Sequence, residues 1–296
     1  MEEHPVNYSE ARTREAMTVL QTATAQANAG DPEGAVAFLH QHLDTVLDSN
    51  VLFSVKQLFM DLLQGINRKR VAGVPWAEQP ARLLGGELDF IVQAALARTG
   101  STVVWQILAD LFPDRVVKAH AFPVLPQPVV ITVRDFRDVV LSRCGVAFHR
   151  QGDALADRLL QVDADTLRDE ARYVAEHERR MRRAMRLYEH MGNALVLYYE
   201  TFFDDLTPVF DALEGFFGLT IDPRRRERLA ATFSLAQNRA ESERLRDFAV
   251  YDNKTQVHGA HVFDGRPGRW AEYLPAVAHD IFEAELRPAL EAWGYA

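Results

Sequence analysis

Short apolar runs alternate with helical stretches from Phe90 onward, and this alternation constrains the fold more than any other feature of the sequence. The apolar runs lie in "DFIVQAALA", "RVVKAHAF", "PVVITVRD" and "NALVLYYETF", and helices are predicted from about Ser101 and about Phe136. Strands that are separated by helices pair in parallel, and helices then cover both faces of the sheet. The predicted fold class is therefore α/β, with a central parallel sheet and helices on both faces.

The N-terminal part has a different pattern. Residues 10–66 show the spacing of apolar residues that is typical of helices, and a helix is predicted to end near Gly65. Between residues 68 and 89 the pattern breaks into Gly, Pro and charged residues. We therefore predict two parts, a helical N-terminal appendage over 1–85, for packing or as a lid, and an α/β domain over 86–296.

Composition narrows the class of protein. The 296 residues are 48% hydrophobic and 25% charged, which suffices for a sizeable core. A net charge of -9 argues against nucleic-acid binding, which needs a surplus of Lys and Arg. No run approaches the ~18 apolar residues of a membrane span, and "MEEHPVNYSE" lacks the pattern of a signal peptide. With Cys144 as the single cysteine, we expect a cytoplasmic protein without nucleic-acid or membrane partners, whose oligomeric state stays open.

The first polar cluster, "ARTGSTVV", follows the first apolar run. Gly100 allows a tight turn, and the amides of Ser101 and Thr102 lie at the predicted helix start, where unpaired N–H groups favour an anion. The hydroxyl of Thr99 and the charge of Arg98 add to this. The pattern is not a Walker A loop, because no lysine follows the glycine. Two interpretations stay open at this point, an anion-binding loop and a plain helix cap.

The second cluster is "VRDFRDVVLS", with Arg134 at a strand end and Ser142 eight residues further on. The two side chains can converge on one oxyanion if a helix begins between them and folds back along the sheet edge. On the alternative interpretation, Arg134, Asp135, Arg137 and Asp138 pair with one another on the surface.

The third cluster lies in "VVKAHAF", where Lys118 and His120 are two residues apart. On a strand this spacing puts both side chains on the same face. A strand histidine beside a same-face lysine, at the end of the strand that follows the anion loop, indicates a functional pair. A structural histidine is the alternative.

Together the three clusters resemble the sulfotransferases that use 3′-phosphoadenosine 5′-phosphosulfate (PAPS), over about residues 88–275. The resemblance implies the P-loop-like sulfotransferase fold. In that family a loop of Lys or Arg, Ser or Thr, Gly, Ser or Thr, and Thr wraps the 5′-phosphosulfate. The matching residues here are Arg98, Thr99, Gly100, Ser101 and Thr102.

The same resemblance assigns the other two clusters. The Arg and Ser that bind the family's 3′-phosphate correspond to Arg134 and Ser142. The lysine that contacts the sulfuryl group corresponds to Lys118, and the histidine base corresponds to His120.

Adenine contacts follow from two weaker matches. "LVLYYETF" resembles the family's Tyr-Glu-Asp strand and makes Tyr199 a neighbour of the base, and "ATFSLAQN" resembles a segment whose phenylalanine, here Phe233, packs on it. The aromatic residue that often follows the first loop is replaced by Val103, with Trp105 displaced by two positions.

"FDGRPGRWAEY" resembles the glycine-rich loop that closes over the 3′-phosphate. The Arg-Lys-Gly of many members is Phe263-Asp264-Gly265 here, so only the glycine matches. The positive charge of this loop is therefore expected from Arg266 or Arg269.

The implied reaction moves the sulfuryl group to a hydroxyl, less readily an amine, of a small molecule or carrier-bound metabolite. His120 removes the acceptor proton, while Arg98 and Lys118 stabilise charge on the departing oxygen. No metal is needed, and such an enzyme suits bacterial specialised metabolism. One alternative is a nucleotide-dependent phosphotransferase of related fold. It is disfavoured because the sequence lacks both a lysine after the glycine and an obvious Asp to hold Mg²⁺. The other alternative is a non-catalytic nucleotide-binding module.

Three further parts of the sequence bear on acceptor or metal binding. Phe148 and His149 follow Ser142, where the family's acceptor pocket often begins, and are predicted substrate contacts. His258 and His261 have a spacing close to that of metal ligands but lack a third ligand, so they are interpreted as structural or substrate-lining residues. The basic runs at 177–186 and 222–228 are interpreted as solvated helix faces, with recognition of an anionic acceptor as the alternative.

Overall fold

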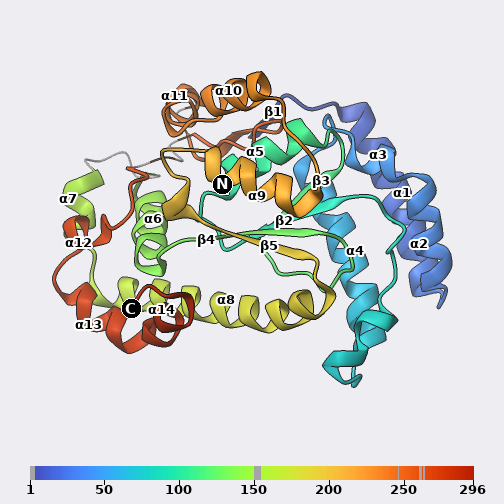
Figure 1. Ribbon diagram of the computed structural model, residues 1–296, viewed down its shortest axis with the longest axis horizontal. Helices are drawn as coiled ribbons and strands as arrows, with labels where there is room; N and C mark the ends of the chain where they lie inside the picture. The colour runs from blue at the N-terminus through green and yellow to red at the C-terminus, as the bar shows by residue number, and fades with distance from the viewer. Residues whose placement is uncertain (1–3, 150–154, 246, 260–261, 263) are drawn as a thin grey trace.

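The computed structural model describes residues 4–149, 155–245, 247–259, 262 and 264–296, with the backbone alone for 147–149 and 156. A four-stranded sheet lies at the centre of these residues (Figure 1). Its strands are β2 (Ile91–Ala95), β3 (Val116–Ala119), β4 (Val129–Val133) and β5 (Ala194–Tyr198), in the order β3-β2-β4-β5. Every pair is parallel, which confirms the predicted sheet.

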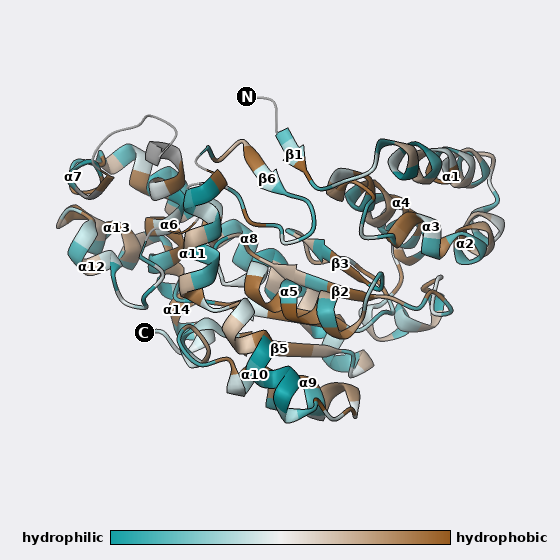
Figure 2. Cartoon of the chain, turned by 90° about the horizontal axis from the view of Figure 1, so that it is seen from above, coloured by the Kyte–Doolittle hydropathy of each residue, from teal (hydrophilic) through white to brown (hydrophobic). Residues whose placement is uncertain are grey.

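Helices cover both faces of this sheet, as predicted. On one face α5 (Ser101–Leu111), α9 (Thr207–Phe217) and α10 (Pro223–Thr232) share an apolar cluster with β2, β3, β4 and β5. The cluster on the other face joins the strands to α4 (Phe53–Val71), α6 (Phe136–His149) and α8 (Ala164–Met191). Brown, hydrophobic residues are prominent on β2 and β5 in Figure 2, and every residue of β2, β3 and β4 is buried, as expected for a parallel sheet that is covered on both sides.

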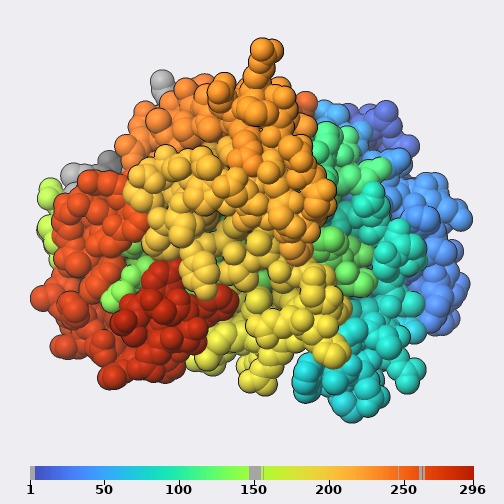
Figure 3. Space-filling model, in the orientation of Figure 1, coloured from blue at the N-terminus to red at the C-terminus, as the bar shows by residue number. Residues whose placement is uncertain are grey.

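The N-terminal helices pack on the sheet rather than standing apart from it. These helices are α1 (Glu10–Asn28), α2 (Pro32–Gln41), α3 (Leu43–Leu47) and α4. The ring of Phe59 in α4 lies 5.2 Å from the ring of Phe90, and the side chain of Gln57 donates a hydrogen bond to the backbone oxygen of Lys118. In Figure 3 the blue N-terminal helices adjoin the rest of the chain along one side. The division at residue 85 stays a prediction.

The predicted helix end near Gly65 is wrong, because α4 continues to Val71. The buried side chains of Leu63, Ile66 and Val71 extend its apolar stripe past the glycine, and packing outweighs the cost of about 1 kcal/mol for a glycine in a helix. Two short 3₁₀ turns, Trp76–Glu78 and Pro80–Arg82, follow in the segment where the pattern breaks.

The remaining elements close the molecule around this centre. Strand β1 (His4–Val6) pairs in parallel with β6 (Val250–Asp252). The short α7 (Leu155–Leu159) follows α6, and α11 (Leu235–Leu245) follows α10. Helix α12 (Trp270–Tyr273) lies against α6, and α13 (Val277–Glu285) and α14 (Arg287–Trp293) lie against α8 (Figure 1). Within the described ranges, no helix is both long enough and apolar enough to span a membrane.

The strand order predicts where a ligand binds. The chain leaves β2 for β3 on one side and returns to β4 on the other side of β2. The connections after β2 and β4 therefore diverge at the carboxyl ends of these strands, where open α/β sheets bind their ligands.

We expect Phe59→Ala to destabilise the whole chain by about 3–5 kcal/mol, because Phe59 is fully buried in the core shared with the sheet. Leu58→Ala is the matched control, since Leu58 is 47% exposed, and its effect should stay within about 0.5 kcal/mol. Urea unfolding followed by circular dichroism measures both. One common transition is expected, and separate transitions for the N-terminal helices and the sheet would contradict a shared core.

Candidate functional site

A pocket lies at the carboxyl ends of β2 and β4. Its walls are the loop before α5, the end of β4 with the first turns of α6, Tyr199, and the loop 264–269. Four arginines line it, namely Arg98, Arg134, Arg266 and Arg269. In a chain of net charge -9, this concentration of positive charge points to an anionic ligand.

The loop before α5 can approach the pocket closely only because residue 100 is glycine. Gly100 has φ +79°, and a Cβ atom there would lie 2.5 Å from Cδ2 of Tyr199. Helix α5 begins at Ser101, so its first amide groups face the ligand side of the loop. Arg98 also has a positive φ, +80°, which turns the chain sharply before the glycine.

The first and second predicted clusters meet in this pocket. Nε of Arg98 donates a hydrogen bond of 2.8 Å to Oγ of Ser142, from α6. Burial, and then the nearby charges of Arg134 and Arg143, lower the pKa of Arg98 to about 9. Cations held this close together gain stability when an anion binds between them.

Arg134 is the most deeply placed cation of the pocket wall, at 6% exposure. Its Nη2 donates to the backbone oxygen of Arg266 at 3.1 Å and lies 3.6 Å from Oδ2 of Asp138, and its guanidinium lies 4.5 Å from the ring centre of Tyr199. Its Nε is buried and has no hydrogen-bond partner among the described residues. This N–H group is left with one hydrogen bond that a ligand oxygen can accept.

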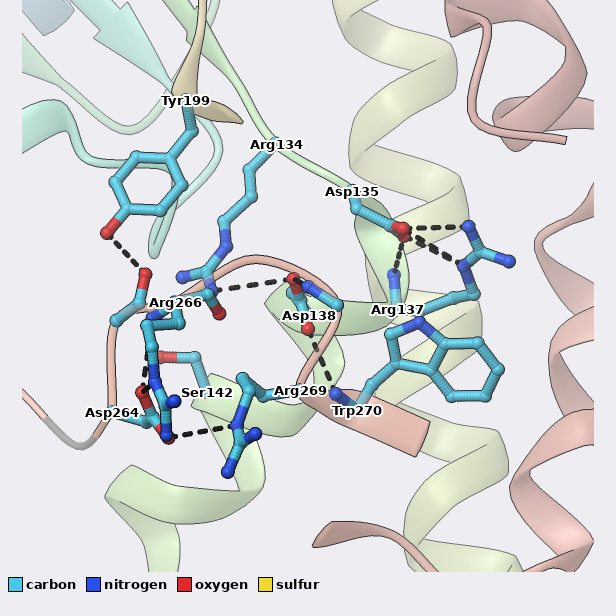
Figure 4. Close-up of polar contacts among 12 residues, drawn as sticks. Arg134, Asp135, Arg137, Asp138, Ser142, Tyr199, Asp264, Arg266, Arg269 and Trp270 are labelled. Carbon is cyan, nitrogen blue, oxygen red and sulfur yellow. Dashed lines mark hydrogen bonds and ion pairs between the residues drawn. The ribbon is translucent and has the colours of Figure 1, made fainter. Parts of the chain in front are cut away.

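Both interpretations of the second cluster hold in part (Figure 4). Arg137 pairs with Asp135 at 2.7 Å, and Arg134 lies near Asp138, so the four residues do interact as the alternative predicts. They are not a surface network, however, because Arg134, Asp135 and Asp138 are buried. Ser142 converges with Arg134 on the pocket, as the first interpretation predicts.

The third cluster lies beside the pocket. Nζ of Lys118 donates to Oγ1 of Thr102 at 2.8 Å, which connects β3 to the first turn of α5. Lys118 is 5% exposed, and burial, together with the charge of Arg98, lowers its pKa to about 7. A lysine that is only part-charged near neutral pH gains its proton fully when an anion binds next to it.

His120 is placed differently from the prediction. Strand β3 ends at Ala119, so the alternation that puts two residues on one face does not extend to His120, and its side chain is exposed whereas Lys118 is buried. The surrounding protein and the charge of Lys118 lower its pKa to about 3, against a hydrogen bond to the backbone of Ala95. The imidazole is neutral at physiological pH.

The loop 264–269 is tied to the pocket by buried polar groups. The hydroxyl of Tyr199 donates to the backbone oxygen of Gly265 at 2.7 Å. The fully buried carboxylate of Asp138 accepts hydrogen bonds from the amides of Gly268 (2.6 Å) and Trp270 (3.0 Å) (Figure 4). Sequence reasoning missed this role of Asp138, because Gly268 and Trp270 lie 130 and 132 positions further along the chain.

Two predicted cofactor residues lie away from the pocket wall. Thr99 is buried, and its hydroxyl is engaged with the backbone oxygen of Leu96 and with Thr132, each at 2.8 Å. Phe233 lines a neighbouring cavity, whose wall shares Tyr199 with the pocket. The predicted roles of both residues stay predictions.

Some predictions fall outside the described residues. These are the side chains of Phe148 and His149, together with Phe263 and His261. His258 is described, and its Nδ1 lies 3.0 Å from the backbone oxygen of Phe248, which favours a structural role. Among the described residues, no group of three His, Cys, Asp or Glu side chains is arranged to hold a metal ion.

The basic runs carry many ion pairs. In the run at 177–186, Arg180 pairs with Glu176 and Arg182 with Glu178. In the run at 222–228, Arg225 pairs with Asp110 at 2.8 Å. These contacts favour the interpretation as solvated helix faces.

Comparison with known proteins gives a fold likeness alone. No family model and no curated protein matches the sequence. A crystal structure of mouse sulfotransferase SULT7A1 complexed with PAP has a TM-score of 0.49 and 13% identity, and covers 68% of this chain and 84% of that chain. Retinol dehydratase in complex with androsterone and inactive cofactor PAP has a TM-score of 0.49 and 16% identity, over 68% and 80%. At these values neither structure bears on what this chain binds.

Gly100→Ala should destabilise the chain more than Gly192→Ala. Both glycines have a positive φ, so each substitution costs about 1–2 kcal/mol in backbone strain, but only at position 100 does the new Cβ meet Tyr199. The overpacking should add about 1–3 kcal/mol, measured as the difference in free energy of unfolding in urea. Equal losses for the two variants would contradict the close approach of this loop to Tyr199.

Proposed function

We propose that this protein is a PAPS-dependent sulfotransferase. The observation that carries the proposal is the meeting of Arg98, Ser142 and Arg134 at one pocket, with Lys118 beside it. These are the residues that the sequence resemblance assigns to the phosphosulfate and the 3′-phosphate. The orphaned Nε of Arg134 and the lowered pKa values of Arg98 and Lys118 fit a ligand with phosphate groups at two ends.

The residues supply binding and charge stabilisation. The first amides of α5 and the guanidinium of Arg98 hold the 5′-phosphosulfate, and Arg134 with Ser142 holds the 3′-phosphate. When bound, PAPS provides the sulfuryl group and a phosphate leaving group. A bond forms between the acceptor oxygen and sulfur while the bond from sulfur to the bridging oxygen breaks. Lys118 and Arg98 stabilise the charge on that oxygen.

The acceptor proton goes to His120. A neutral imidazole can accept a proton, and the low pKa of His120 is caused in part by the charge of Lys118. Negative charge bound beside Lys118 offsets that effect and raises the pKa of His120 toward the range of an effective base. The base is therefore expected to become stronger when the nucleotide is in place.

The adenine is assigned to the cavity that adjoins the pocket. Tyr199 belongs to the walls of both, and Val103 and Phe233 line the adjoining cavity. Tyr199 also holds the backbone of Gly265, so its ring connects the adenine side to the glycine-rich loop.

The acceptor is a hydroxyl, less readily an amine, of a small molecule or carrier-bound metabolite, with Phe148 and His149 as proposed contacts. Cytoplasmic location is proposed from the single cysteine, Cys144, which is buried and whose pKa burial raises to about 12.

The binding half of the proposal is tested with 3′,5′-adenosine bisphosphate (PAP). We expect PAP to bind without Mg²⁺, and Arg134→Ala to weaken its Kd about ten- to hundredfold, because charge-assisted hydrogen bonds contribute about 1.5–3 kcal/mol. Arg172→Ala, an exposed arginine on α8, should leave the Kd unchanged. Isothermal titration calorimetry with EDTA or Mg²⁺ measures this. Binding of ATP that requires Mg²⁺ would instead support a phosphotransferase.

The catalytic half is tested by a mass-spectrometric screen of hydroxyl compounds with PAPS, scoring the addition of sulfate. His120→Ala should lower turnover about 10²- to 10⁴-fold and leave PAP affinity unchanged, because a general base acts on the reaction and not on the nucleotide. His190→Ala, on the surface of α8, is the control. Sulfation by His120→Ala at the wild-type rate would remove His120 as the base. No product with any acceptor, despite PAP binding, would support a non-catalytic nucleotide-binding module.

A further inference from the structure

A carboxylate, that of Asp264, lies inside the arginine-lined pocket. Its Oδ1 accepts a hydrogen bond from Nε of Arg266 at 2.6 Å, and its Oδ2 accepts one from Nε of Arg269 at 3.0 Å (Figure 4). The hydroxyl of Tyr273 reaches Oδ2 at 3.3 Å, and the backbone oxygen of Asp264 accepts from Arg239. The side chain is only 10% exposed, so these contacts and the pocket itself surround it.

The contacts of Asp264 reduce the net positive charge of the glycine-rich loop. Arg266 gives Asp264 two nitrogens, Nε and Nη2, and Arg269 is held between Asp264 and Glu272. The two arginines and the two carboxylates sum to zero charge. Of the four arginines that line the pocket, two are thus neutralised, by Asp264 of the same loop and by Glu272 of α12.

The neutralised arginines lie next to the residues assigned to the 3′-phosphate. Nη2 of Arg134 donates to the backbone oxygen of Arg266, and Ser142 lines the same pocket as Asp264. The hydrogen bond from Arg266 lowers the pKa of Asp264 to about 2, so the carboxylate is ionised throughout the physiological range. A phosphate that binds here is therefore repelled by Asp264 and competes with it for Arg266 and Arg269.

We propose that Asp264 is a specificity-determining residue that limits how much affinity this pocket gains from the 3′-phosphate of its nucleotide. It acts by holding Arg266 and Arg269 and by its own negative charge. The proposal rests on the proposed function, since it concerns the same nucleotide. Substitution of a residue that supports binding weakens nucleotide affinity, whereas substitution of Asp264 is expected to strengthen it. Removal of the carboxylate makes the site better for a 3′-phosphate.

Asp264→Asn tests this directly. The amide has nearly the same shape, and its one oxygen still accepts hydrogen bonds from arginine. Its NH₂ group cannot accept the bonds made by the other carboxylate oxygen, so the loop keeps part of its contacts while the negative charge is lost. We expect the Kd for PAP to fall about tenfold. The Kd for adenosine 5′-monophosphate, which lacks the 3′-phosphate, should stay within about twofold, with both measured by calorimetry at the same salt concentration. Asp280→Asn, an exposed carboxylate on α13, is the control for total charge and should change neither Kd.

A double-mutant cycle separates the role of Asp264 from a change in loop structure. In an Arg266→Gln background, Asp264→Asn should improve PAP binding less than it does alone, because the arginine that it releases is gone. Thermal unfolding checks that the variants are folded. Asp264→Ala, which removes the charge without an amide, gives a second route to the same expected gain.

The outcomes are distinguishable. Unchanged or weaker PAP binding by folded Asp264→Asn or Asp264→Ala would overturn the proposal, because it would make Asp264 an organiser of the loop. An equal gain for PAP and adenosine 5′-monophosphate would also overturn it, since the effect would not depend on the 3′-phosphate. If neither wild type nor any variant binds PAP, the proposed function itself fails.

Discussion

The parallel pairing of β2 with β3 on one side and with β4 on the other is the constraint on which the pocket depends. Val92 stands opposite both Val117 and Val129, so the three strands end at nearly the same level. Arg98 follows β2, His120 follows β3 and Arg134 follows β4. Without this register the three polar clusters would leave the sheet at different heights and could not share one ligand.

The pocket holds positive charges close together at an electrostatic cost. Burial and mutual repulsion lower the pKa values of Arg98 and Lys118, which means that the folded chain holds their charged forms less favourably than water does. Two carboxylates act on the other three arginines of the pocket, in different ways. The carboxylate of Asp138 accepts hydrogen bonds from two backbone amides and lies near Arg134. The carboxylate of Asp264 pairs with arginines of its own loop. The first organises the wall, and the second sets the net charge available to a ligand.

The large apolar core allows such a site to exist. Side chains from α1 to α4 join the strands and α8 in one cluster, so the N-terminal helices contribute to the stability of the fold that holds the arginines. The side chain of Gln57 in α4 donates a hydrogen bond to the backbone of Lys118, so these helices directly contact β3, the strand that carries this predicted catalytic lysine. A role of these helices in packing follows from the contacts themselves.

The sequence by itself determined the fold class, the four strands and the starts of α5 and α6, because hydrophobic periodicity and turn residues are local signals. It also predicted that Arg134 and Ser142 could meet. Only the tertiary structure decided what depends on distant contacts. It continued α4 past Gly65 because buried neighbours outweigh the glycine, and it ended β3 one residue before His120. It also brought the loop 264–269, with Asp264, to Arg134 and Asp138. Pairings between residues 130 positions apart, such as Asp138 with Gly268, arise from chain topology, and no local pattern encodes them.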